Sequence, residues 1–225
     1  RVIVALDNNN LKETLLIVSS LKKEVHSFKI GYEFFFNFGI EGYKKIKKIC
    51  PNIFLDLKLH DIPNTVKNGL IAINKLKPLL TTIHISGGDY MLKSSIFKNS
   101  FTKIIGVSIL TSLDSTQTKK YYNQNKIDIL VKDFAKQARK HNLDGIVCSP
   151  KEISLVRKQV GKNFLIITPG IRLSTKNEKN DDQKRILTPV DAISLGADLL
   201  VIGRPITGSK NPLKTLNAIN NSISK

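Results

Sequence analysis

The chain has 225 residues, of which 41% are hydrophobic and 24% are charged, so it is long enough for one sizeable core. No apolar run approaches the roughly 20 residues of a membrane-spanning helix, and we expect no membrane partner. The net charge of +18 is spread along the chain without a long basic block or interleaved aromatic residues. We therefore expect no nucleic-acid partner, and we interpret the positive field as an attraction for an anionic small molecule.

Short apolar or β-branched runs alternate with amphipathic segments along the chain. We expect strands at residues 2–6, 27–31, 53–58, 81–86, 103–109, 144–149, 164–168 and 199–203. Helical spacing lies between them, as in Leu11, Leu15, Val18 and Leu21, and Pro63 opens a similar segment. This alternation, without linker or repeat, predicts an α/β fold: a single (β/α)8 TIM barrel over residues 1–225. A doubly wound open sheet is the alternative, although no GxGxxG follows the first strand.

The third expected strand carries charges in an apolar setting, in the stretch FLDLKLHDIPNTV (residues 54–66). Alternate residues of a strand share a face, so Asp56 and Lys58 point one way and the neighbouring leucines the other. In a barrel this charged pair enters near the C-terminal mouth, where active sites of the fold lie. Asp61 follows just beyond the strand. An exposed strand face with an incidental ion pair is the alternative interpretation.

Two other strand ends add charges at the same mouth. Lys29 lies inside the second strand between Phe28 and Ile30, and Asp7 ends the first strand. Each has an ordinary alternative, a lysine that reaches solvent or a helix-capping aspartate. Together with the third strand they predict a pocket of alternating charges, in which the lysines stay protonated and the carboxylates stay ionised.

The last two strands end in segments suited to an anion. ITPGIR (167–172) brings Arg172, and VIGRPIT (201–207) brings Gly203 and Arg204. Phosphate sites of this fold are often built from the loops after strands seven and eight, where glycine allows close approach and arginine offers a bidentate fork. Between them, residues 172–185 are polar and without apolar periodicity, which predicts a lid, with a plain surface loop as the alternative.

The remaining reactive side chains give weaker signals. Cys50 and Cys148 are isolated, which is typical of reduced structural thiols in a cytoplasmic protein and argues against a metal site. HISGGD (84–89) is expected to be a plain turn between a strand and a helix, and His84 is expected to be a core histidine.

Six segments, in order and spacing, resemble one known family. They are VALD, FKIGYE, FLDLKLHDIPNTV, DGIVCS, TPGIR and VIGRPIT. The family is orotidine 5′-phosphate decarboxylase, in its compact bacterial form. The resemblance implies a (β/α)8 barrel that works as a homodimer without a cofactor. It also implies a carboxy-lyase that converts orotidine 5′-monophosphate into UMP and CO2, the last step of pyrimidine nucleotide synthesis.

The same resemblance implies roles for individual residues. Lys58 is the acid that protonates C6 of the pyrimidine. Lys29, Asp56, Lys58 and Asp61 form the charged array, with Asp61 supplied by the partner subunit. The implied substrate contacts are Asp7 and Lys29 with the ribose, Thr65 from the partner, Thr111 with the pyrimidine, and Arg172, Gln183, Gly203 and Arg204 with the phosphate.

Two other functions remain open at this point. A sister branch of the barrel acts on sugar phosphates with Mg²⁺ and shares an Asp-x-Lys-x-x-Asp strand, but it resembles this chain less, because it has a metal-binding Glu where this chain has Lys29. A basic RNA-binding protein that uses the barrel as a scaffold is the second alternative, and salt-sensitive RNA retention without UMP production would favour it.

Overall fold

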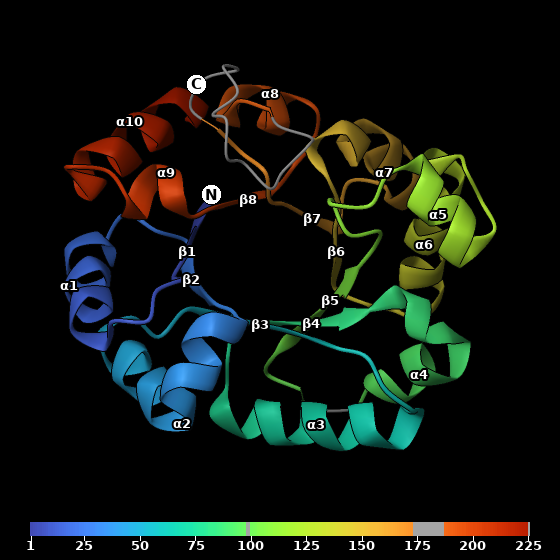
Figure 1. Cartoon of the computed structure of the whole chain (residues 1–225), viewed down its shortest axis with the longest axis horizontal. Coiled ribbons are helices and arrows are strands. Elements are labelled where there is room, and N and C mark those ends of the chain that lie inside the picture. Colours follow the sequence, from blue (N-terminus) through green and yellow to red (C-terminus); the bar gives the residue numbers. More distant parts are fainter. Residues whose placement is uncertain (98–99, 173–186, 225) are drawn as a thin grey trace.

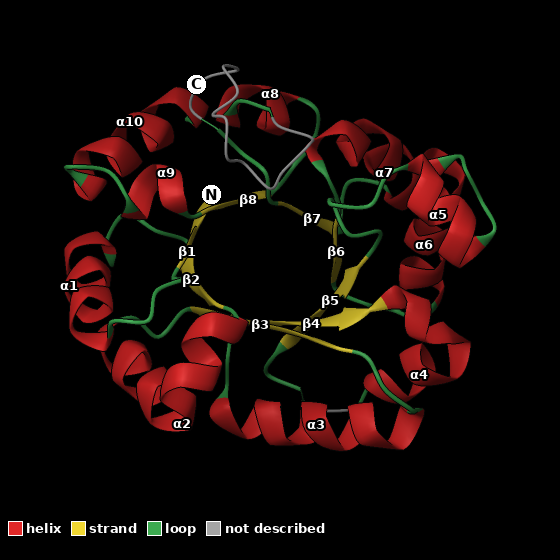
Figure 2. Ribbon diagram, in the orientation of Figure 1, coloured by secondary structure: helices red, strands yellow, loops and turns green. Residues whose placement is uncertain are grey.

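The strands form one closed parallel ring, and the helices surround it. A computed structural model of the chain describes residues 1–97, 100–172 and 187–224. Figure 1 shows the barrel end-on, and Figure 2 shows the strands on the inside with the helices around them. The strand order is β1-β2-β3-β4-β5-β6-β7-β8, and β8 pairs with β1 to close the barrel. The predicted (β/α)8 fold is confirmed.

The elements follow the predicted alternation. The strands are β1 (Val2–Ala5), β2 (Ser27–Ile30), β3 (Ile53–Leu59), β4 (Leu80–His84), β5 (Lys103–Val107), β6 (Gly145–Val147), β7 (Leu165–Thr168) and β8 (Leu199–Ile202). The α-helices of the described part are α1 (Leu11–Leu21), α2 (Tyr32–Ile49), α3 (Pro63–Leu76), α4 (Gly88–Ser95), α5 (Ser115–Tyr122), α6 (Ile127–Lys140), α7 (Ile153–Val160), α8 (Pro189–Ser194), α9 (Arg204–Thr207) and α10 (Pro212–Ile223). Two short 3-10 turns are η1 (Ile85–Gly87) and η2 (Pro150–Glu152).

Local chemistry sets where helices begin. Asn10 precedes α1 and its side-chain oxygen accepts the Glu13 N–H at 3.2 Å, which satisfies one of the free donors of the first turn. Pro63 stands in the first turn of α3, where its fixed φ fits and no N–H is needed. The predicted apolar face of α3 is buried at Val66 and Leu70.

The core has two layers. An inner cluster fills the barrel, and an outer cluster lies between the strands and the helices. The fully packed members of the inner layer are Ile3, Phe54, Leu80, Ile105, Ile167 and Leu199. Because consecutive strand residues face opposite sides, Phe54 enters the barrel while Leu55 packs outward against the helices. The described part of the barrel interior is therefore filled by packed side chains.

Several strands are shorter than predicted. The predicted strand 81–86 ends at His84, where η1 begins, and 103–109 ends at Val107. The predicted strand 144–149 is reduced to Gly145–Val147. After β5 and β6 a single backbone hydrogen bond to the neighbouring strand continues the pairing by one residue, from Ser108 to Val147 and from Cys148 to Ile167, before the connection begins. The turn predicted at 84–89 is confirmed, with η1 leading directly into α4.

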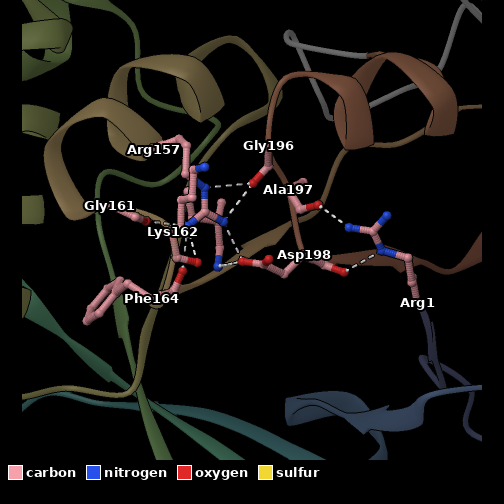
Figure 3. A network of polar contacts seen from close by, with 9 residues as sticks. Arg1, Arg157, Gly161, Lys162, Phe164, Gly196, Ala197 and Asp198 are labelled. Atoms are coloured by element: carbon pink, nitrogen blue, oxygen red, sulfur yellow. Dashed lines mark hydrogen bonds and ion pairs between the residues drawn. The ribbon is translucent and has the colours of Figure 1, made fainter.

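The N-terminal ends of the strands are tied together by arginines (Figure 3). Arg157, from α7, donates to the carbonyl oxygens of Gly196 at 2.7 Å and Phe164 at 2.9 Å, and pairs with Asp198 at 2.5 Å. The same Asp198 carboxylate accepts the N–H of Ile166 in β7. This network fastens β7 to the start of β8, at the end of the barrel opposite the mouth.

None of the helices among the described residues is both long and apolar enough to cross a bilayer. The expected lid, residues 172–185, lies outside the described residues except for Arg172.

Candidate active site

The third strand departs from regular geometry where its charges stand. Asp56 lies on the inner face of β3 and is only 7% exposed. Between Leu55 and Leu59 the pairing of β3 with β4 shifts, and Lys58 has a φ of 42°. A non-glycine residue in this region carries about 1–3 kcal/mol of backbone strain. Asp56 and Lys58 do converge as the alternation predicted, but they do so through a local distortion and not along a regular strand.

The predicted charges meet at the mouth of the barrel. The Asp56 Oδ2 atom lies 2.8 Å from Lys58 Nζ and 3.7 Å from Lys29 Nζ. Lys29 Nζ also lies 3.2 Å from Asp7 Oδ1. Three adjacent strands, β1 to β3, thus deliver a continuous row of alternating charges: Asp7, Lys29, Asp56 and Lys58. We refer to these four residues as the charged array.

Mutual attraction keeps the buried members ionised. Burial alone would lower the pKa of Lys29, but the negative charges of Asp56 and Asp7 outweigh it and raise that pKa. Burial likewise opposes ionisation of Asp56, yet Lys29 and Lys58 lower its pKa below the ordinary value. At neutral pH Lys29 and Asp56 therefore carry opposite fixed charges at buried positions, where charges interact strongly.

A glycine leaves room for the array. Gly31 directly follows β2, and a Cβ atom there would stand 2.8 Å from Lys29 Nζ and 3.3 Å from Asp7 Oδ1. Real Cβ atoms are essentially never so close to another heavy atom as the first of these distances. A side chain at position 31 would therefore force the Lys29 ammonium to shift from its present position beside Asp7.

Lys58 opens onto a hollow of about 540 Å³ beside the mouth. Asp61 and Thr65 of the same chain line it, and both are exposed. Asp61 accepts the N–H of Ile62 at 2.6 Å. His84 also lines the hollow, with its ring 5.2 Å from that of His60, so its expected place in the core is wrong. Partial burial, His60 and Lys58 lower the pKa of His84 to about 4, so it is neutral at pH 7.

The residues expected to hold an anion follow the last strands. Arg172 lies after β7, where its N–H donates to Leu187 and its side chain to Ile171. Gly203 and Arg204 follow β8 directly, with Arg204 exposed. Thr111 is half-buried in the turn after β5. Gln183 lies outside the described residues.

Two contacts of the array were not identified from the sequence. The Thr82 hydroxyl, from β4, lies 2.9 Å from Asp56 Oδ1 and 2.9 Å from the Lys58 nitrogen of the backbone. Tyr32, at the start of α2, donates to the carbonyl of Leu57, and Lys58 Nζ lies 5.8 Å from its ring centre. A threonine inside an apolar run was a usable signal, because a buried hydroxyl needs a partner.

No group of three or more His, Cys, Asp or Glu side chains among the described residues could hold a metal ion. Cys50 and Cys148 are both free and buried, as expected for structural thiols. Burial raises the pKa of Cys148, which keeps it a thiol.

Comparison with known proteins places the chain in one family. The family described as "Orotidine 5′-phosphate decarboxylase / HUMPS family" matches residues 1–219. The chain is 44% identical over 225 residues to the orotidine 5′-phosphate decarboxylase of Wolbachia sp. subsp. Brugia malayi, covering 99% of each chain. It is 42% identical to that of Coxiella burnetii, covering 99% of this chain and 96% of the relative.

The solved structures agree. The crystal structure of orotidine 5′-phosphate decarboxylase from Lactobacillus acidophilus is similar with a TM-score of 0.85 and 35% identity, over 100% of this chain and 99% of that one. The match therefore extends over the barrel as a whole and includes the strands that carry the charged array. The chain belongs to the orotidine 5′-phosphate decarboxylase / HUMPS family.

Proposed function

We propose that this protein converts orotidine 5′-monophosphate into UMP and CO2, the last step of pyrimidine nucleotide synthesis, with Lys58 as the proton donor. The observation that carries the proposal is the placement of the Asp56 carboxylate between two ammonium groups at the barrel mouth. Such a row of fixed charges suits a reaction in which a negative charge develops at one ring atom.

The reaction breaks the bond between C6 and the carboxylate carbon. The bonding electrons remain on C6 in the plane of the ring, where the π system cannot delocalise them, and CO2 leaves. The Lys58 ammonium stabilises this carbanion and then transfers a proton to C6, so that the lysine becomes a neutral amine and takes up a proton from water. Asp56, at 2.8 Å from Lys58 Nζ, orients the ammonium.

The rest of the substrate is bound by residues of other strands. Asp7 and Lys29 hold the ribose and Thr111 contacts the pyrimidine. The phosphate is bound at the ends of β7 and β8 by Arg172, Gln183, Gly203 and Arg204, with the expected lid closing over it. Binding energy from the phosphate, which does not react, then serves to hold the base against the array.

The active unit in this proposal is a homodimer, in which Asp61 and Thr65 enter the partner's site. Phe36 is 78% exposed and Ile62 is 67% exposed, and Phe36 lines the hollow that also holds Asp61. Apolar side chains gathered beside a site are typical of an interface. In a two-fold dimer each hollow would receive the same residues from the other subunit.

The metal-dependent branch of the barrel fits this chain less well. Lys29 stands where that branch carries a metal-binding Glu, and its ammonium is already paired with Asp7 and Asp56. A divalent cation there would face a fixed positive charge. We also propose the cytoplasm as the location, since the two free cysteines suit a reducing compartment.

The decisive experiment is direct. Purified protein is mixed with orotidine 5′-monophosphate, and the loss of its absorbance and the formation of UMP are followed with and without EDTA. We expect UMP and CO2 in equal amounts and no effect of EDTA. Absence of UMP would contradict the proposal, and a rate abolished by EDTA and restored by Mg²⁺ would favour the metal-dependent branch.

A further inference from the structure

Thr82 lies at the centre of the contacts that shape the charged array. It is a fully buried residue of β4, beside the point where the pairing of β3 with β4 shifts. Its one hydroxyl touches both a side chain and the backbone of the neighbouring strand: Asp56 Oδ1 and the Lys58 N–H, each at 2.9 Å. No other side chain among the described residues has hydrogen bonds to both Asp56 and the Lys58 backbone.

The direction of these two hydrogen bonds is fixed by chemistry. A backbone N–H can only donate, and an ionised carboxylate can only accept. The hydroxyl of Thr82 therefore accepts a hydrogen bond from the Lys58 N–H and donates its own hydrogen to the Asp56 carboxylate. Each bond supports the other, because the hydroxyl that receives the N–H becomes a better donor to the carboxylate.

This link meets the needs of an irregular strand. At Lys58 the backbone has a φ of 42°, and the shift in pairing between Leu55 and Leu59 interrupts the regular ladder with β4. The Thr82 hydroxyl supplies the acceptor that a regular strand would have provided as a backbone carbonyl. In this left-handed conformation the Lys58 side chain turns back toward Asp56 and reaches it at 2.8 Å.

We propose that Thr82 is the positioning residue of the array: its hydroxyl holds the Lys58 backbone in the left-handed conformation and the Asp56 carboxylate in place, and so directs the ammonium at the reacting carbon. This inference rests on the proposed decarboxylase function. It concerns the geometry of the chemical step and leaves the binding of phosphate and ribose unaffected.

A matched control stands next to Thr82. Thr81 is also fully buried in β4, and its hydroxyl donates to the carbonyl of Leu55 at 2.9 Å. Thr81→Val removes a buried hydrogen bond between the same two strands without touching the array. Thr82→Val makes the same change of side chain and removes both contacts of the array. Thr82→Ser keeps the hydroxyl.

We expect Thr82→Val to lower kcat by about 100-fold, the loss that a misplacement of about 1 Å produces, with KM for orotidine 5′-monophosphate changed by less than about threefold. Thr81→Val should keep kcat within about threefold of wild type, and Thr82→Ser should recover most of the activity. Thermal unfolding of each variant confirms that it is folded at the assay temperature. Should Thr82→Val not fold, Thr82→Ala against Thr81→Ala makes the same comparison without placing a methyl group on the carboxylate.

Equal losses of kcat in the two valine variants would assign Thr82 a merely structural role and overturn the inference. A Thr82→Ser variant as slow as Thr82→Val would do the same. Crystal structures of the valine variants give a readout independent of turnover: Lys58 should leave the positive-φ region in Thr82→Val and keep it in Thr81→Val. If wild type does not decarboxylate the substrate, the proposed function fails, while these structures still decide whether Thr82 holds Lys58.

Discussion

At the scale of single residues, Asp56 is the organising member of the charged array. Its two oxygens have different tasks: Oδ1 accepts from Thr82, and Oδ2 faces the ammonium groups of Lys58 and Lys29. A buried carboxylate is tolerated only when it is paired in this way. The balance also fixes its pH response. Because the pKa of Asp56 is lowered in the folded state, its contribution to stability is present above the ordinary aspartate pKa and is lost as the pH falls below it.

Lys58→Ala tests the proton donor. We expect kcat to fall by at least about 10³-fold, since the variant loses both the charge that stabilises the carbanion and the proton that quenches it. UMP should still bind, as measured by calorimetry, because the phosphate and ribose contacts remain. Lys44→Ala, which removes an exposed lysine paired with Glu41 on α2, is the control. A Lys58→Ala variant with near-native kcat would remove Lys58 from the mechanism.

Arg204→Ala tests the phosphate site. We expect kcat/KM for orotidine 5′-monophosphate to fall by about 10²-fold or more, and activity on the phosphate-free nucleoside to change little. Lys210→Ala removes another exposed positive charge from the segment after α9 and should affect neither substrate. Equal losses for the two substrates in Arg204→Ala would show that Arg204 does not contact the phosphate.

At the scale of elements, the two ends of the strands have different roles, one in the candidate active site and one in stability. The C-terminal ends carry the array, and the N-terminal ends carry ties between strands. Asp144 precedes β6 and accepts the N–H of Ile104 in β5, as Asp198 before β8 accepts that of Ile166 in β7. Each aspartate therefore connects its own strand to the preceding one, at the end of the barrel that supports stability more than chemistry.

Asp198→Asn separates these two roles. The amide cannot pair with Arg157 as a carboxylate does, so we expect the free energy of unfolding to fall by about 1–3 kcal/mol. Because the site lies at the opposite end of the barrel, kcat below the unfolding transition should stay at the wild-type value. Asp133→Asn, an exposed carboxylate on α6, is the control for loss of a charge. Denaturant unfolding and kinetics of both variants measure the two effects, and a lowered kcat in folded Asp198→Asn would contradict the division.

The sequence predicted the barrel because strand and helix periodicities alternate without interruption, and it predicted the array because charges inside apolar strands must find partners. It could not predict the left-handed backbone of Lys58 or the link through Thr82. Both depend on the register between β3 and β4, which joins residues more than twenty positions apart in the chain. The prediction that His84 lies in the core was wrong because His84 lines a hollow that is formed by residues distant in the chain, such as Tyr32 and Thr65.

At the scale of the whole molecule, the proposed dimer makes a quantitative prediction. Lys58→Ala and Asp61→Ala are each expected to be inactive. After subunit exchange, each mixed dimer holds one site with both defects and one native site, so roughly a quarter of wild-type activity should return. In the single chain Lys58, Asp61 and Thr65 line the same hollow, so action within one chain is a real alternative. A mixture that stays inactive after exchange has been verified by mass spectrometry would establish that alternative.

The net charge of +18 provides the second prediction at this scale. A positive field attracts a phosphorylated, carboxylated substrate, and salt screens that attraction over about 8–10 Å at physiological ionic strength. We expect kcat/KM to fall as NaCl rises from low to physiological concentration, while kcat stays constant because the buried array is screened far less. Steady-state kinetics in matched buffers measures both values. A kcat that falls in parallel would contradict this separation.

The pairing of Val2 with Leu200, which closes the barrel, affects how the chain folds during its synthesis on the ribosome. All four residues of the charged array precede β4, so they are synthesised early, yet β1 gains its second neighbour only once β8 has emerged. Until then the growing sheet has two open edges, which are templates for pairing with other chains. Contacts between such distant residues also form slowly. The finished barrel has no edge, but we expect the nascent chain to expose both edges until β8 has been synthesised.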